Sequence, residues 1–208
     1  MVTQYKELGI QAVRTHDYYG PLDMASIYPN QNADPTLVSS YNFTESDRMY
    51  RAILENGFEP YIRLGNSYNN SGPVTNQANF VRACLEVVKH YIELSKSYSK
   101  QLHYVEIWNE PDNSHFWRGS PQQFYSLFID IFTTLKQNFP ELKVGGPGFA
   151  PSGYLALGGI NFTKGFLDAL RARGIKLDFF SWHVYTNNPA EFTKGYDLLY
   201  PGASSSWF

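Results

Sequence analysis

The stretch LHYVEIWNEPD, residues 102–112, decides how this sequence is interpreted. Its first half is a short apolar run with β-branched and aromatic residues, which is typical of a buried strand. The run stops at Trp108-Asn109-Glu110-Pro111, because Pro111 cannot donate to a sheet ladder and disfavours a helical conformation at Glu110. A carboxylate is therefore expected at the C-terminal tip of a strand. In parallel α/β barrels, catalytic residues come from these tips.

Strands and helices alternate on both sides of this stretch. The predicted strands are Ile10–His16, Phe58–Leu64, Leu102–Trp108, Lys143–Gly146 and Leu177–Tyr185, and the predicted helices are Thr3–Gly9, Thr44–Gly57, Phe80–Tyr98, Ser120–Phe139 and Thr163–Arg173. Strict alternation at this spacing predicts a parallel sheet with right-handed crossovers. An open doubly wound sheet is the alternative. No glycine-rich phosphate loop follows any predicted strand, which argues against it.

Local signals set some of the boundaries. Ser120, Pro121 and Gln123 form the pattern of a capping box with proline at the first helical position. Thr44 is predicted to cap its helix, and Pro147-Gly148 is predicted to end a strand. The segments 21–41 and 65–79 are predicted to be long polar loops, which on barrels are often functional.

Composition limits the class of protein. The 208 residues suffice for one domain with a substantial core, and 43% hydrophobic residues argue against disorder. A formal charge of -2 argues against nucleic acid or an anionic membrane as partner, and no apolar run approaches the ~20 residues of a membrane span. The single cysteine, Cys84, is predicted to be a core residue. The N-terminus lacks the pattern of a signal peptide, and three N-x-S/T sequons do not settle the compartment.

The five residues from Trp108 to Asp112 resemble the acid/base strand of retaining glycosidases built on TIM barrels. Within that group the chain is most similar to the family that contains β-xylosidases and α-L-iduronidase. Two further strand tips match the family, at Val13–Asp17 and at Asp178–Tyr185. The resemblance implies that residues 1–208 are a (β/α)8 TIM barrel catalytic domain, here incomplete.

The strand count leads to that expectation of a partial barrel. In the family the Asn-Glu strand is the fourth of eight, so the five predicted strands correspond to strands two to six. The family's nucleophile, a glutamate at the tip of the seventh strand, has no counterpart. Asp17, Asp178 and Glu191 are the possible substitutes, and none combines a strand tip with the family's nucleophile position.

Glu110 is expected to be the general acid/base, which protonates the leaving glycosidic oxygen and then activates water. That role needs a raised pKa, which apolar walls or a second carboxylate supply. The resemblance implies that Asn109 binds the sugar 2-OH and that His16 and Asp17 hold the innermost sugar. It also implies that His183 contacts the substrate and that Tyr185 contacts the nucleophile.

The remaining candidates are aromatic or charged. Trp108 and Trp117 are expected to contact the sugar, although ordinary loop packing is as good an explanation for Trp117 and its neighbour Phe116. Arg14 and Arg63 lie inside strands, so we expect them to be paired in the barrel interior. Glu106 shares a strand face with Glu110 and receives no role.

Other chemistries have no support in the sequence. The five histidines show no metal-ligand spacing, and no G-x-S-x-G elbow is present, so neither a metal nor another cofactor is expected. The leading hypothesis is a retaining O-glycoside hydrolase that acts on a β-xyloside-like substrate. The alternatives are a non-catalytic carbohydrate-binding protein with the same cleft, and a fragment without function whose open sheet edges invite aggregation.

Overall fold

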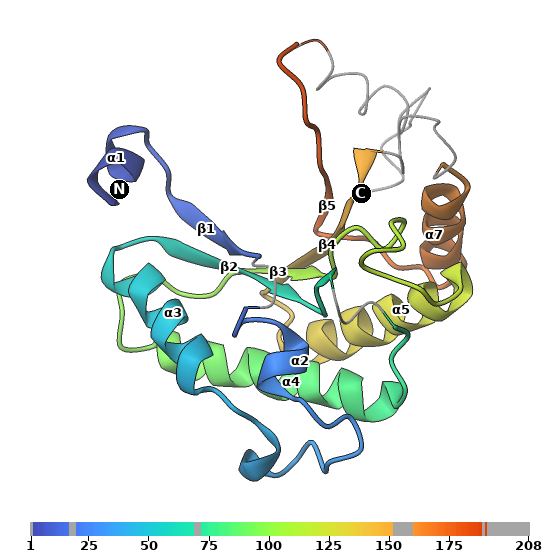
Figure 1. The fold of residues 1–208 in the computed structure, drawn as a ribbon, viewed down its shortest axis with the longest axis horizontal. Helices are drawn as coiled ribbons and strands as arrows, with labels where there is room; N and C mark the ends of the chain where they lie inside the picture. Colours follow the sequence, from blue (N-terminus) through green and yellow to red (C-terminus); the bar gives the residue numbers. More distant parts are fainter. Residues whose placement is uncertain (1, 17–19, 69–71, 152–159, 189, 191–208) are drawn as a thin grey trace.

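The computed structural model describes residues 2–16, 20–68, 72–151, 160–188 and 190. Its sheet has five parallel strands in the order β1-β2-β3-β4-β5, namely Ala12–Thr15, Glu59–Leu64, Tyr104–Ile107, Lys143–Phe149 and Phe179–Trp182. Strand order follows chain order, as the alternation of elements predicted. The sheet curls into half of a barrel (Figure 1), which confirms the predicted fold class of an incomplete β/α barrel.

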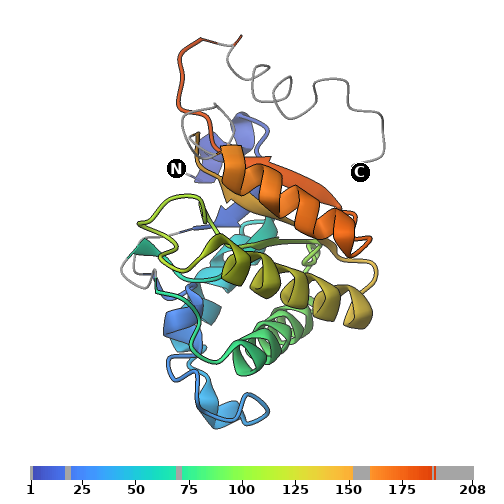
Figure 2. The ribbon, with the colours of Figure 1, turned by 90° about the vertical axis from the view of Figure 1, so that its right-hand side faces the viewer.

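The helices are α1 Val2–Glu7, α2 Met24–Ile27, α3 Thr44–Glu55, α4 Gln77–Ser95, α5 Pro121–Asn138 and α7 Ile160–Ala172, with a 3-10 turn, η1, at Val38–Ser40. Helices α3, α4, α5 and α7 lie against one face of the curled sheet, whereas α1 lies beyond the start of β1 (Figures 1 and 2). Helix α4 packs on α5, and α5 packs on α7. None of the helices in the described ranges is long and apolar enough to cross a membrane.

The main core lies between the sheet and these helices. On α4 the predicted apolar stripe is buried, including Phe80, Val88 and Tyr91, and Cys84 is a fully buried free thiol in the same stripe. Val105 and Ile107 of β3 face these helices. Burial of this stripe is what holds α4 to the sheet, because helices of this length gain most of their stability from packing.

The inner face of the sheet carries a different set of side chains. At the N-terminal end of the strands, the rings of Tyr61, Tyr104 and Phe179 contact one another, with centroids 5.7–6.1 Å apart. Charged and polar side chains follow above these rings, toward the C-terminal tips. Alternation along each strand therefore separates an apolar outer face from an inner face that becomes polar toward the tips.

Several predicted boundaries are wrong by one to three residues; β5, for example, ends at Trp182 and not at Tyr185. Thr44 is the first helical residue of α3 rather than its cap, and its backbone N–H lies 3.3 Å from Asn42 Oδ1. Strand β4 does not end at Pro147 but continues to Phe149, through a cis Gly146–Pro147 bond and a shift in its register with β5. A proline is tolerated in a strand at such an irregularity, because no ladder hydrogen bond is needed there.

The capping box is confirmed. Ser120 Oγ accepts from the backbone N–H of Gln123 at 3.2 Å, and Gln123 Oε1 accepts from the backbone N–H of Ser120 at 2.7 Å. The predicted polar loop at 21–41 contains α2 and η1. Met24 and Ile27 of α2 are buried in the core, so this segment is more ordered than its polar composition suggests.

Candidate active site

The chain turns sharply where β3 ends. Trp108 and Glu110 both have positive φ angles, 75° and 47°, which are uncommon for residues other than glycine. Two hydrogen bonds hold this turn, from Trp108 N to Leu64 O at 2.8 Å and from Glu110 N to Gly148 O at 3.0 Å. Because β3 ends at Ile107, these contacts replace ladder pairing and aim Asn109 and Glu110 away from the strand axis.

Glu110 is held by two side chains. His183 Nδ1 lies 2.6 Å from Glu110 Oε1, and Asn113 Nδ2 donates to Glu110 Oε2 at 3.1 Å. Burial alone would raise the pKa of the Glu110 carboxyl, but the hydrogen bonds from His183 and Asn113 outweigh burial. The pKa therefore lies below its ordinary value of 4.5.

This direction differs from the raised pKa that the acid role requires. The physical reason is that the groups acting on Glu110 within the described residues are hydrogen-bond donors and the imidazoles of His183 and His16. Each of these stabilises the ionised carboxylate. At neutral pH, Glu110 is therefore a carboxylate in this arrangement.

Asn109 lies beside Glu110 with one half of its amide engaged. Its Oδ1 accepts from Arg14 Nη2 at 2.9 Å. Its Nδ2 is buried and has no hydrogen-bond partner among the described residues. An amide N–H without a partner at a strand tip is available to an acceptor brought by a ligand.

His16 also lies at this end of the sheet, after β1. Burial and the nearby guanidinium groups of Arg63 and Arg14 lower the pKa of His16 to about 4, so its imidazole is neutral at physiological pH. The ring packs against Phe116 at a centroid distance of 6.0 Å. The structure therefore brings His16, Asn109, Glu110 and His183 to one end of the half-barrel, whereas Asp17 lies outside the described residues.

Trp108 occupies a different place from the one expected of a sugar-binding residue. Its side chain is 0% exposed and its indole N–H donates to Phe116 O at 3.1 Å. The ring faces the helices, near Phe80 and perpendicular to Trp117. A methyl group at Gly65 would lie 2.5 Å from Trp108 Cε3, so the absence of a side chain at Gly65 makes room for the indole.

Trp117 and Tyr185 lie in different surroundings, the first buried by packing and the second exposed beside His183. Trp117 is 4% exposed and its indole N–H donates to Ser120 O at 3.1 Å, which fits the packing alternative. Tyr185 is 81% exposed, beyond the end of β5, and its ring is 6.4 Å from that of His183. Neither ring is in direct contact with Glu110 in this arrangement.

The structure identifies partners for the strand arginines that the sequence left unassigned. Arg14 pairs with Glu106, and Arg63 pairs with Asp23. Ser67 Oγ also donates to Asp23, at 2.8 Å. Both arginines therefore belong to buried or half-buried ion pairs, as expected for charges inside strands.

Asp178, one of the possible nucleophiles, lies at the opposite end of the sheet. Its carboxylate accepts from Lys136 Nζ and from Val144 N, both at 2.9 Å, just before β5 begins. The prediction that Asp178 lies at the wrong end of its strand is confirmed. Glu191 lies outside the described residues.

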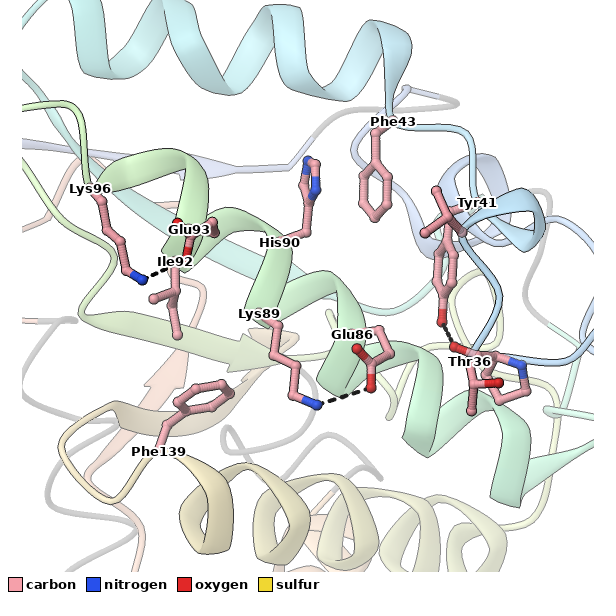
Figure 3. A pocket seen from close by; sticks show the side chains of 12 residues that line it. Thr36, Tyr41, Phe43, Glu86, Lys89, His90, Ile92, Glu93, Lys96 and Phe139 are labelled. Carbon is pink, nitrogen blue, oxygen red and sulfur yellow. Dashed lines mark hydrogen bonds and ion pairs between the residues drawn. The ribbon is translucent and has the colours of Figure 1, made fainter.

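A groove on the outer surface is separate from these residues (Figure 3). It has a volume of about 620 Å³ and runs along the exposed side of α4, between residues 35–43 and Phe139. Ion pairs within α4, Lys89–Glu86 and Lys96–Glu93, flank its apolar floor. Among the described residues, no group of three or more His, Cys, Asp or Glu side chains could hold a metal ion.

A curled parallel β/α sheet with Asn-Glu at a strand tip fits the barrel glycosidases that the sequence resembles. The sequence model described as Glycosyl hydrolases family 39 matches residues 1–199, so the chain belongs to this family. It is 26% identical to a β-xylosidase from Geobacillus stearothermophilus over 94% of the chain, and 24% identical to one from Caldicellulosiruptor saccharolyticus over 88%. The chain spans about 40% of the length of these relatives: 40% of the first and 38% of the second.

Solved structures support the same fold. A glucosidase from Croceicoccus marinus superposes with a TM-score of 0.80 at 24% identity, covering 95% of this chain and 43% of that one. A β-xylosidase of family 39 from Caulobacter crescentus gives a TM-score of 0.70 at 21% identity, covering 97% and 46%. At these identities the likeness concerns the architecture of the barrel.

Proposed function

We propose that residues 1–208 are part of the catalytic barrel of a retaining O-glycoside hydrolase, with Glu110 as its acid/base and a β-xyloside-like substrate. The observation that carries the proposal is the placement of Glu110 at the tip of β3, between His183 and Asn113, with the unpartnered Nδ2 of Asn109 beside it. In retaining hydrolysis such an amide strengthens its bond to the sugar 2-OH in the transition state.

The β-xyloside substrate is inferred from the family and from the β-xylosidases among the relatives. Asn109 supplies a neutral donor for a sugar hydroxyl. His16, which is neutral at physiological pH because its pKa is lowered to about 4, can donate or accept. Asp17 and Tyr185 remain candidates for substrate contact, while the buried indoles of Trp108 and Trp117 would support the strand tip by packing.

The depressed pKa of Glu110 is compatible with the acid role once a second carboxylate is nearby. A retaining mechanism places a nucleophile about 5 Å from the acid/base. Like-charge repulsion at that distance favours the protonated form of Glu110 and raises its pKa. The five described strands contribute Glu110, while its partner is expected from the family's seventh strand.

The test is hydrolysis of xylobiose, whose sugar leaving group needs protonation, by the gene product read from source DNA across both ends of this sequence. Glu110→Gln should lower kcat/KM by roughly 10²–10⁴-fold, because it removes proton transfer. Glu59→Gln is the matched control, since Glu59 pairs with His103 at the N-terminal end of β2, the end of the sheet opposite Glu110. Proton NMR of the first product should show retained β configuration.

An unchanged rate in Glu110→Gln, beside an unchanged control, would contradict the acid/base role. A first product of α configuration would contradict the retaining mechanism.

A non-catalytic carbohydrate-binding role is the second candidate. It is favoured by one observation, that the buried Nδ2 of Asn109 has no partner among the described residues and can bind a sugar hydroxyl without hydrolysis. Under this candidate, xylose and xylobiose should perturb the NMR signals of Asn109 and His183, and no xyloside should be hydrolysed. Hydrolysis that Glu110→Gln abolishes would exclude it.

A further inference from the structure

We propose that Glu106 is the positioning residue of this site, and that its two carboxylate oxygens hold the two residues of the Asn109-Glu110 tip through separate chains of contacts. One oxygen acts on Asn109 through Arg14. The other acts on the backbone of Glu110 through Ser181 and Gly148. The meaning for catalysis rests on the proposed function of Glu110, but the contacts can be tested without turnover.

Glu106 is the most heavily hydrogen-bonded carboxylate of the inner face. It is 1% exposed and lies on β3, four residues before Glu110 and on the inner side of the sheet. Its Oε2 accepts from Arg14 Nε at 2.7 Å and also pairs with Arg14 Nη2. Its Oε1 accepts from the hydroxyls of Tyr61 at 3.2 Å and Ser181 at 2.6 Å. A buried carboxylate whose two oxygens both accept hydrogen bonds is held in one orientation.

The first chain of contacts leads to the side chain of Asn109. The guanidinium of Arg14 is oriented by Glu106, and its Nη2 also donates to Asn109 Oδ1 at 2.9 Å. This bond fixes which end of the amide faces Arg14. The Nδ2 end is then presented without a partner among the described residues, as a sugar hydroxyl would require.

The second chain of contacts leads to the backbone of Glu110. The Ser181 hydroxyl donates to Glu106 and accepts from Gly148 N at 2.8 Å. The carbonyl of Gly148 in turn accepts from Glu110 N at 3.0 Å. This link matters because Glu110 has a positive φ and lies beyond the last residue of β3, so no ladder pairing holds it.

The two chains of contacts meet around Gly148. A methyl group at this position would lie 3.3 Å from Arg14 Nη2, Glu106 Oε1 and His183 Nε2. Its φ of +60° is also a conformation that favours glycine. Gly148 is therefore packed so closely that it has no room for a side chain. Glu106 lies beside its Cα, and Glu110 donates its backbone N–H to the Gly148 carbonyl.

Only an ionised carboxylate satisfies all of these donors. The Glu106 oxygens receive two N–H groups of Arg14 and two hydroxyls, whereas an amide presents one acceptor and one donor group. In Glu106→Gln the negative charge that pairs with Arg14 is lost, and the amide NH2 faces the donors that one carboxylate oxygen accepted from. Glu106→Leu removes both acceptor oxygens.

The experiment compares four variants of this chain by NMR: Ser181→Ala, Arg14→Lys, Glu106→Gln and Glu106→Leu. Two signals are followed at fixed pH. The hydrogen-exchange rate of the Glu110 backbone amide reports the Gly148 contact, and the side-chain NH2 resonances of Asn109 report the Arg14 contact. Glu59→Gln is the control, because it alters a carboxylate of the same sheet that pairs with His103 outside the site.

Ser181→Ala and Arg14→Lys each break one of the two chains of contacts, so each should affect one signal. Ser181→Ala should accelerate exchange at Glu110 roughly tenfold, the factor given by one net hydrogen bond, and leave Asn109 as in the wild type. Arg14→Lys keeps the positive charge but loses the planar guanidinium that bonds Glu106 and Asn109 together. It should therefore shift the Asn109 side-chain signals and change the exchange rate of the Glu110 amide by less than about twofold. Glu106→Leu should change both signals, and Glu106→Gln at least one.

The proposal is overturned if Glu106→Gln and Glu106→Leu leave both signals at the values of the control. It is also overturned if Ser181→Ala disturbs Asn109 as strongly as Glu110, because that result indicates general loosening. Should Glu106→Leu fail to fold, Glu106→Gln, Ser181→Ala and Arg14→Lys still test the proposal. None of these signals depends on hydrolysis, so failure of the proposed function would be recognised separately.

Discussion

Glu106 lies within β3 and Glu110 lies just beyond its C-terminal end, and the structure places these two glutamates in opposite situations. Glu106 is paired in the ladder opposite Arg63 and Gly145, and donors occupy both of its oxygens. Glu110 lies three residues past the end of the strand, with a positive φ and a 7% exposed side chain. The first is held by regular structure, and the second is held by contacts that its neighbours supply.

This difference teaches that depth along a barrel strand, more than residue type, determines what a carboxylate does. One layer below the tips, a charge must be neutralised inside the sheet, as Arg14 does for Glu106. At the strand tip, a carboxylate such as Glu110 can keep hydrogen bonds that a bound substrate would replace or share. Three predictions sharpen or break this contrast.

The largest expected effect is on stability. Glu106→Leu leaves Arg14 without its anion and should lower the free energy of unfolding by about 3 kcal/mol. Glu110→Gln keeps the shape at the tip and should lower it by about 1 kcal/mol or less. Urea unfolding followed by circular dichroism measures both. Equal losses would show that the two glutamates do not differ in structural role.

The second effect is a pH dependence from His16, at the tip of β1. Its pKa is about 4 when folded and 6.5 in an unfolded chain, so the unfolded state binds the extra proton. Stability should therefore be full above pH 6.5 and fall as the pH drops from 6.5 towards 4. In His16→Gln the midpoint of urea denaturation should change less with pH across this window than in the wild type. A wild-type profile without slope there would contradict the burial of a neutral imidazole.

The smallest effect concerns the protonation of Glu110 alone. His183→Phe removes the hydrogen bond at Glu110 Oε1 and keeps a ring, so burial should then dominate and the pKa of Glu110 should rise. The sign for stability follows: a carboxyl whose folded pKa is depressed contributes stability above the unfolded value of 4.5, which is lost as the pH falls through the folded pKa. The variant should lose that contribution.

Carbon-13 NMR titration of the Glu110 carboxyl measures the shift directly. The pKa of Glu110 should stay unchanged in Glu59→Gln, because Glu59 pairs with His103 at the N-terminal end of β2. A rise of similar size in that control would show that the effect is not specific to the hydrogen bond.

Much of the fold could be predicted because its signals are local. Apolar runs placed all five strands to within a few residues, and the Ser120 capping box fixed the start of α5. Parallel order followed from alternation alone. The end of β4 could not be predicted, since Pro147 normally stops a strand and here lies at an irregularity whose cause is the pairing with β5.

The candidate site was predictable in its residues and less so in their orientation. Strand tips pointed to His16, Glu110 and His183, which the structure brings to one end of the sheet. The positive φ angles at Trp108 and Glu110 depend on contacts with Leu64 and Gly148, which are distant in sequence. For this reason the burial of Trp108 behind the tip could not be foreseen.

Ser181 is a residue that sequence reasoning missed although a signal existed. It lies two positions before His183 and therefore shares its inner face. Asn113, which donates to Glu110, had no such signal, because its place depends on the turn that follows Pro111. Period-two reasoning along β5 would have found Ser181, and only the three-dimensional turn shows Asn113.

The indole of Trp108 has a consequence for how this sequence can vary. Its ring occupies the space left by the missing side chain at Gly65, on the helix side of the sheet. A side chain at position 65 would meet this ring and would also be strained by the backbone φ of +114°, so Gly65 is required for two separate reasons. An engineer who trims Trp108 to widen a sugar cleft would instead open a void among the helices, and the cleft would keep its width.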